Sequence, residues 1–252
     1  MRQFFILLRK ELRSFFLSPL AYVIIALFTF LNGWLFSGIV NAMSMRVNQH
    51  SLVYNLFDSG WFWMGYFFLF PLLTMRLFAE EKKLGTLETL FTAPVHTAQV
   101  VLAKYVATCV LYVVIMLPIF GFFFLFEDIT GEQAAFQSGS FYGAAAILLL
   151  LGLANIAFGC FASSLTSNQL IAAMITFVVV MLHFFLGYVL HFFGANMPAE
   201  LLNKITYLSS IEHRKMFTEG LIDSRPIVYY LSSAILMLFL THHVLERRRW
   251  QA

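Results

Sequence analysis

The sequence predicts an all-α polytopic membrane protein, and three observations lead to this fold class. Of the 252 residues, 60% are hydrophobic and only 12% carry a charge, whereas a soluble domain carries about 25% charged residues. Apolar segments of about 20 residues, the length that crosses a bilayer core, recur six times along the chain. All 13 Asp and Glu residues fall between these segments or at their ends. We therefore expect one membrane domain, residues 1–252, with six transmembrane helices.

The N-terminal segment, residues 2–16, predicts an amphipathic helix that lies in the membrane interface. At helical spacing, aromatic and leucine side chains share one face while Arg2, Arg9 and Arg13 share another, a pattern typical of interfacial helices. A cleaved signal peptide is the alternative, because residues 40–42 resemble a cleavage site. The apolar run that follows the basic segment has about 22 residues, longer than the 7–15 of a signal peptide. We therefore expect an uncleaved anchor.

The apolar segments give approximate bounds for the membrane spans. The fourth span carries Ala145, Gly152 and Gly159 at seven-residue intervals, and small residues in such a row let another helix approach closely. Between the first and second spans we expect a polar loop over residues 41–58. The six spans are expected at about 19–40, 60–79, 100–126, 140–163, 170–193 and 226–245.

The long interval between the fifth and sixth spans, residues 196–225, is expected to contain short helices. Ser209 and Glu212 have the spacing of a capping box, which marks a helix N-terminus. Gly220 is a suitable C-terminal residue for that helix, because glycine adopts the left-handed conformation at helix ends. We expect this segment to lie outside the cytoplasm.

The distribution of basic residues predicts the orientation. Of the 16 Lys and Arg residues, 11 fall in the N-terminal segment, in the loop after the second span with its flanks, and at the C-terminus. Because cytoplasmic segments carry an excess of Lys and Arg, both termini and this loop are expected in the cytoplasm. The 11 residues are Arg2, Arg9, Lys10, Arg13, Arg76, Lys82, Lys83, Lys104, Arg247, Arg248 and Arg249.

The loop over residues 80–99 predicts a short helix suited to docking another protein. Gly85 is expected to end the preceding helix, and Thr86 to cap a new helix in which Glu88 favours the positive N-terminal end. Pro94 ends that helix, since the residue before a proline is pushed out of the helical region. A simple solvated connection is the alternative. The apolar side chains of the short helix, for which the rest of the chain offers no evident partner, are Leu84, Leu87, Leu90 and Phe91.

Sequence motifs for catalysis are absent from the chain, so we expect no enzyme activity in this subunit. There is no Gly-Lys dipeptide and hence no nucleotide-binding P-loop, no Gly-x-Ser-x-Gly elbow and no His-Glu-x-x-His helix. A proton- or sodium-coupled transporter usually has an ionisable group at mid-membrane, and no carboxylate lies there. Cys109 and Cys160 lie inside separate apolar segments, so we expect packing residues rather than a disulfide.

Histidines on the fifth span allow two interpretations. His183 and His191, with Met174 and Met181 nearby, resemble a path for a soft metal. Packing of these histidines against neighbouring helices, or at the interface, is the alternative that we favour. For the many aromatic residues of the second span we likewise favour lipid-facing and packing surface over a substrate path. We therefore predict no metal site and no bound cofactor in this chain.

Several stretches of the chain resemble a known family. Glu80-Glu81, Gly85-Thr86, Glu88, Leu90, Pro94 and Lys104 resemble the first cytoplasmic loop of ABC-2 type transporter permeases. Residues 18–23 and 207–250 are similar to the gliding-motility-associated (GldF-like) permeases and to their NosY-like relatives in nitrous-oxide-reductase maturation. The order of the parts also agrees: an interfacial helix, six spans and a long external segment before the last span.

The resemblance implies the partners and the setting of the protein. It implies a permease subunit of the bacterial inner membrane that pairs with itself or a sister permease. A dimer of cytoplasmic ABC ATPases would bind ATP and Mg²⁺ and drive export of a substrate. Membrane lipid and a periplasmic or auxiliary membrane protein are further expected partners, and nucleic acid is not. The alternative is a mechanotransmission or scaffold subunit that acts on an envelope partner without transport.

The resemblance also implies roles for individual residues. The short helix after the second span would be the coupling helix, which sits in a groove of the ATPase. The second and fifth spans would line the subunit interface and with it the substrate path. The coupling residues are Glu80, Glu81, Gly85, Thr86, Leu87, Glu88, Leu90 and Pro94, and the path residues are Trp63, Tyr66, Phe67, His183 and Tyr188.

Overall fold

The computed structural model describes residues 2–45, 50–87, 95–131, 138–193 and 208–249, and the regular structure of these residues is helical throughout. The helices are α1 (Arg2–Phe16), α2 (Pro19–Met45), α3 (Leu52–Asp58), α4 (Gly60–Thr74), α5 (Ala79–Lys83), α7 (Thr97–Thr130), α8 (Ser138–Leu165), α9 (Gln169–Phe193), α11 (Ser210–Thr218) and α12 (Ser224–Arg249).

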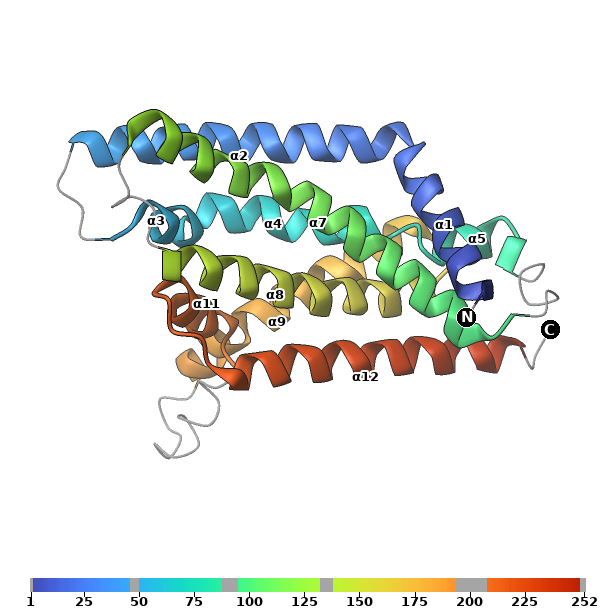
Figure 1. Cartoon of the computed structure of the whole chain (residues 1–252). Coiled ribbons are helices and arrows are strands. Elements are labelled where there is room, and N and C mark those ends of the chain that lie inside the picture. Colours follow the sequence, from blue (N-terminus) through green and yellow to red (C-terminus); the bar gives the residue numbers. More distant parts are fainter. Residues whose placement is uncertain (1, 46–49, 88–94, 132–137, 194–207, 250–252) are drawn as a thin grey trace.

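Six of the helical segments are long and apolar enough to cross a membrane, which confirms the predicted fold class. They are α2, the segment from α4 through α5, α7, α8, α9 and α12. In Figure 1 these helices run side by side, and α1 crosses one end of the bundle at an angle. We call the end with α1, α5 and the C-terminal end of α12 the terminal end. The opposite end, which carries α3 and α11, is the distal end.

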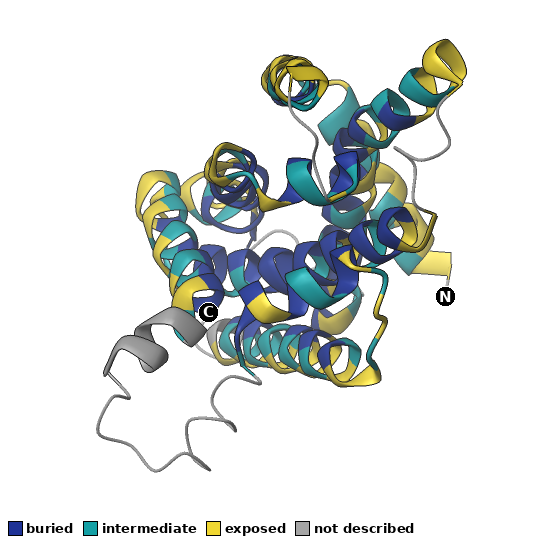
Figure 2. Cartoon of the chain, turned by 90° about the vertical axis from the view of Figure 1, so that its left-hand side faces the viewer, coloured by how far each residue is buried: buried dark blue, intermediate teal, exposed yellow. Residues whose placement is uncertain are grey.

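Helix α8 occupies the middle of the bundle because small residues let its neighbours approach. A Cβ atom on Gly152 would lie 2.2 Å from the Tyr112 ring of α7, and one on Gly159 would lie 2.2 Å from the Thr74 hydroxyl of α4. The predicted row of small residues therefore serves two helices rather than one. Viewed from the distal end in Figure 2, buried residues face the middle of the bundle and exposed residues face outward.

Large apolar side chains are also exposed on the outer face of the bundle. On α2, Phe30 is 67% exposed and Trp34 is 72% exposed. On α12, Phe239 is 61% exposed. Exposed apolar surface of this extent needs a cover other than water, and the hydrocarbon of a bilayer supplies one.

The second span differs from its prediction as one helix over residues 60–79. Helix α4 ends at Thr74, a turn over residues 75–78 follows, and the separate helix α5 begins at Ala79. The hydroxyl of Ser163 on α8 accepts hydrogen bonds from the backbone N–H groups of Phe78 (3.0 Å) and Ala79 (3.1 Å). This contact satisfies donors that a continuous helix would have used internally, so the break is stabilised from another helix.

The prediction of a polar loop over residues 41–58 is wrong. Helix α2 continues to Met45, and residues 52–58 form α3. The backbone N–H of Tyr54 donates to the hydroxyl of Ser51, which caps α3. One side of this short helix is apolar and fully covered by the bundle, which provides the burial that stabilises it. Its buried residues are Leu52, Val53, Leu56 and Phe57.

The predicted helix of the external interval is confirmed within the described residues. The hydroxyl of Ser209 accepts from the backbone N–H of Glu212 at the start of α11. Beyond the end of α11, Gly220 has a φ of +84°, the left-handed conformation that favours glycine. The first part of the interval, residues 196–207, lies outside the described residues.

Close contact between α8 and α11 predicts a sensitive position at Gly143. A Cβ atom there would lie 1.8 Å from the carbonyl oxygen of Phe217, which is backbone and cannot rotate away. We expect Gly143→Ala to destabilise the protein by about 1–3 kcal/mol, the range of overpacking, measured by thermal unfolding of the purified protein in detergent. The control is Gly139→Ala on the same helix, whose Cβ would meet Gly220 only at 3.8 Å. Equal melting temperatures for the two variants would contradict the packing described here.

Candidate functional site

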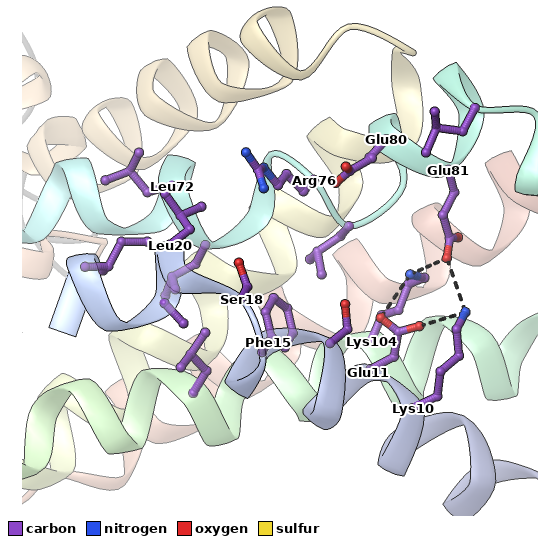
Figure 3. Close-up of a pocket in the computed structure, with 17 residues that line it drawn as sticks. Lys10, Glu11, Phe15, Ser18, Leu20, Leu72, Arg76, Glu80, Glu81 and Lys104 are labelled. Carbon is purple, nitrogen blue, oxygen red and sulfur yellow. Dashed lines mark hydrogen bonds and ion pairs between the residues drawn. The ribbon is translucent and has the colours of Figure 1, made fainter.

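Lys104 connects three helices at the terminal end. Its Nζ lies 2.9 Å from Glu81 Oε1 on α5 and 3.2 Å from Glu11 Oε2 on α1, while Lys104 itself belongs to α7. The side chain of Lys10 adds longer ion pairs to both carboxylates, at 3.5 Å to Glu11 and 3.8 Å to Glu81. Figure 3 shows the four side chains converging. We call Lys10, Glu11, Glu81 and Lys104 the charge cluster.

Three members of the charge cluster are largely withdrawn from solvent, whereas the Lys10 side chain is 58% exposed. Lys104 is only 3% exposed and Glu11 only 9%, and the Lys104 ammonium also lies 5.6 Å from the centre of the Phe78 ring, within the range of a cation–π contact. Removing one member of a buried ion pair leaves an uncompensated charge, which costs about 3–5 kcal/mol. The cluster therefore favours a fixed arrangement of α1, α5 and α7.

Sequence reasoning placed Lys104 near the interface but did not identify Glu11 as its partner. Helix α1 turns the stripe formed by Phe4, Leu8, Leu12 and Phe15 toward the bundle, and Glu11 lies on that same stripe. An acidic residue on the apolar face of an amphipathic helix is a signal that could have been used. It requires a buried cation on another element.

In the loop after α5, the helix break at Gly85 agrees with the prediction, whereas the role of Thr86 differs from it. Gly85 has a φ of +70°, so this glycine ends the helical segment, and its N–H donates to the carbonyl of Lys82. Helical structure resumes at Thr86 itself, and the Thr86 hydroxyl donates to the carbonyl of Glu81 at 3.3 Å. The predicted N-cap bonds of Thr86, and residues Glu88, Leu90 and Pro94, lie outside the described residues.

Two leucines of the predicted docking face have opposite environments. Leu84 is 67% exposed, as a docking residue requires, whereas Leu87 is 4% exposed and belongs to the hydrophobic core of this chain. The expectation that the chain offers no partner for this face is therefore wrong for Leu87. Glu80 lines the neighbouring pocket and has no side-chain partner among the described residues.

The path candidates Trp63 and Phe67 line a groove between α4 and α9. Both rings contact Phe184, with centroid distances of 4.5 Å and 4.9 Å. The groove has a volume of about 630 Å³ and is lined mainly by aromatic and methionine side chains, with charged residues toward the distal end. A hydrogen bond to α3 holds the Trp63 ring in place, since its indole N–H donates to the carbonyl of Phe57 at 2.7 Å.

The other path candidates lie elsewhere. Tyr66 is fully buried within the chain, and its hydroxyl contacts the Tyr112 hydroxyl at 3.1 Å and the Leu148 carbonyl at 3.3 Å. His183 is 9% exposed and stacks on Tyr229 with a centroid distance of 5.7 Å. Neither residue lines the groove. The side chain of Tyr188 lies outside the described residues.

A second buried cation, Arg214, holds the distal end, and no sequence pattern predicted it. One guanidinium nitrogen of Arg214 donates to the Phe57 carbonyl at 2.8 Å, and another lies 2.8 Å from a carboxylate oxygen of Asp58. The guanidinium also lies 5.8 Å from the centre of the Trp63 ring. Arg214 thereby connects α11 with α3 and α4. The contact could not be found without α3, which was expected to be a loop.

The fold and these two ends define a multi-pass α-helical membrane protein. A comparison with family models matches residues 46–211 to the ABC-2 family transporter proteins. This match covers most of the chain, and the chain belongs to that family. It is thus a permease subunit, the membrane component of an ABC transporter, and the family implies partnership with an ATPase subunit. A comparison with curated proteins gives no match.

The charge cluster predicts that Lys104 is required for stability. Lys104→Gln leaves Glu11 and Glu81 without their main cation, so we expect a loss of about 3–5 kcal/mol and a melting temperature lower by on the order of 10 °C. Thermal unfolding in detergent measures the loss. Lys83→Gln, an exposed charge on the same short helix α5, is the matched control.

A double variant separates the ion pair from other effects of the substitution. If Lys104 and Glu81 interact directly, Glu81→Gln combined with Lys104→Gln costs less than the sum of the single changes. Additive losses, or a Lys104→Gln protein as stable as the Lys83→Gln control, would contradict the arrangement.

Proposed function

We propose that this chain couples ATP hydrolysis by a separate cytoplasmic ABC ATPase dimer to export of a substrate out of the bacterial inner membrane or across it. The observation that carries the proposal is the charge cluster beside the loop over residues 84–96. Glu81 lies on α5, directly before this loop, and is bound to Lys104 of α7 and, through it, to Glu11 of α1. A displacement of the loop is therefore transmitted to two further helices.

The second route of transmission runs through the turn over residues 75–78. This turn joins α5 to α4, so α5 can change its angle without bending a continuous helix. Helix α4 carries Trp63 and Phe67, which line the groove against α9. Movement at the loop would thus reach the groove as well as α7.

The groove between α4 and α9 is the proposed contribution of this chain to the substrate path. A second permease subunit, either another copy or a sister chain, would complete the path from its own corresponding helices. The aromatic lining favours a substrate with apolar surface. Tyr66 and His183 would then act behind the groove, where they hold α4 and α9 in place.

The remaining parts of the proposal concern setting and relatives. Both termini and the loop would face the cytoplasm, where the partner ATPase binds ATP and Mg²⁺. The excess of Lys and Arg at the terminal end supports this orientation. Within the family we propose a place among the GldF-like and NosY-like permeases, on the sequence similarity of residues 18–23 and 207–250.

The exposed residue Leu84 tests the docking surface. We expect Leu84→Asp to weaken binding of the ATPase roughly tenfold or more, because burial of one leucine contributes about 1.5–3 kcal/mol. The test uses the affinity-tagged full chain, purified from native membranes, with mass spectrometry to identify and quantify the ATPase that co-purifies. Ile222→Asp, a 60% exposed apolar residue between α11 and α12, is the control.

The expected result is loss of the ATPase from the Leu84→Asp complex and its retention in the control, with equal amounts of permease in the membrane. Retention in both variants would overturn the assignment of the docking surface. Absence of any ABC ATPase from the wild-type complex would overturn the proposed function itself.

A further inference from the structure

A pocket at the terminal end lies beside the charge cluster and has two distinct sides. Its volume is about 300 Å³, and α1, the start of α2, the segment from α4 to α5, and α7 contribute its walls. Figure 3 shows its lining residues. One side is apolar and belongs to the membrane spans, with Leu20, Ala21 and Ile24 of α2 opposite Leu72 and Leu73 of α4. Such a division suits an amphiphile, which places its head and its tail in different surroundings.

The other side of the pocket contains charges that have no partner in the part of the chain that the structure describes. The guanidinium of Arg76 and the carboxylate of Glu80 make no ion pair or side-chain hydrogen bond among the described residues. Figure 3 draws no bond between these two side chains. Among the described residues, the pocket therefore offers one unpaired cation, Arg76, and one unpaired carboxylate, Glu80.

The positive and negative charges that line the pocket are equal in number, and this balance favours a zwitterionic lipid headgroup over an anionic one. Three cations line it, Lys10, Arg76 and Lys104, together with three carboxylates, Glu11, Glu80 and Glu81. A neutral pocket gives no general preference for an anionic ligand. A guanidinium binds phosphate with two parallel hydrogen bonds, and carboxylate oxygens accept from an ammonium, which has three N–H donors. A zwitterion with both groups satisfies both sets.

We propose that this pocket binds a phospholipid of the adjacent leaflet whose headgroup carries a primary ammonium, namely phosphatidylethanolamine. Its phosphate binds Arg76, its ammonium binds the carboxylate of Glu80, and an acyl chain follows the apolar side between α2 and α4. A choline headgroup has no N–H to donate, and a glycerol headgroup has no positive charge. The site therefore selects ethanolamine over both. This proposal does not depend on the proposed coupling to an ATPase.

Lipid binding to the purified full chain tests the proposal. Native mass spectrometry measures retention of added phosphatidylethanolamine, phosphatidylcholine and phosphatidylglycerol with the same acyl chains. We expect the wild type to retain phosphatidylethanolamine at least roughly fivefold better than the other two, a preference of about 1 kcal/mol. Free phosphoethanolamine is added as a competitor, to distinguish a site that binds only the headgroup from a site that binds the whole lipid. We expect it to displace the bound lipid only weakly, because the acyl chain contributes to binding.

Two variants separate the roles of the charged residues. Arg76→Gln is expected to lower retention of all three lipids, whereas Glu80→Gln is expected to abolish the preference for ethanolamine over choline and leave phosphatidylcholine retention unchanged. Arg9→Gln on α1 and Lys83→Gln on α5 replace exposed charges outside the pocket and serve as controls. Because neither Arg76 nor Glu80 has a side-chain partner among the described residues, both variants should melt at the wild-type temperature without lipid.

The proposal is overturned by either of two results. One is equal retention of the three lipids by the wild type, or a preference for phosphatidylglycerol. The other is an unchanged preference for phosphatidylethanolamine over phosphatidylcholine in the Glu80→Gln protein, or wild-type retention of all three lipids by the Arg76→Gln protein.

Discussion

The ion pairs of Lys104 are the interaction on which the terminal end depends. A lysine buried to 97% of its surface is unfavourable unless anions surround it, and here the two anions come from Glu11 on α1 and Glu81 on α5. Because the buried ammonium is stable only beside these two carboxylates, the ion pairs constrain where α1, α5 and α7 can lie. An amphipathic helix, a short helix beside the loop and a membrane span must keep their relative positions for the charges to stay compensated.

The distal end follows the same physical logic with a different cation. Arg214 of α11 is compensated by Asp58 and by the Phe57 carbonyl, both from α3. Between the two ends the spans are held by close packing, in which Gly152 and Gly159 of α8 admit their neighbours. Buried cations thus fix α1, α5 and α7 at the terminal end and α3, α4 and α11 at the distal end, and apolar contacts join the helices along their length. In the proposed coupling, such a bundle would transmit a displacement of one end as a movement of whole helices.

The sequence predicted the features that depend on local properties. Each span is apolar enough to be recognised alone, and the cap at Ser209 and the left-handed Gly85 depend only on neighbouring residues. Features that depend on distant residues were missed. The break after α4 is stabilised by Ser163, 85 positions along the chain from Phe78, and α3 exists because the bundle covers its apolar side. The burial of Leu87 and the partners of Lys104 likewise depend on the assembled fold. For this region the sequence therefore predicted only that a loop with a helix break follows the second span.

The most direct test of force transfer is hydrogen–deuterium exchange of the assembled permease–ATPase complex, with and without a non-hydrolysable ATP analogue. We expect that binding of the nucleotide alters the rate of hydrogen–deuterium exchange in three segments at once, around Glu11, around Glu81 and around Lys104. We also expect that Lys104→Gln confines the change to the loop and α5. A nucleotide-dependent change that spares these segments, or that is identical in the Lys104→Gln complex, would contradict the proposed force transfer.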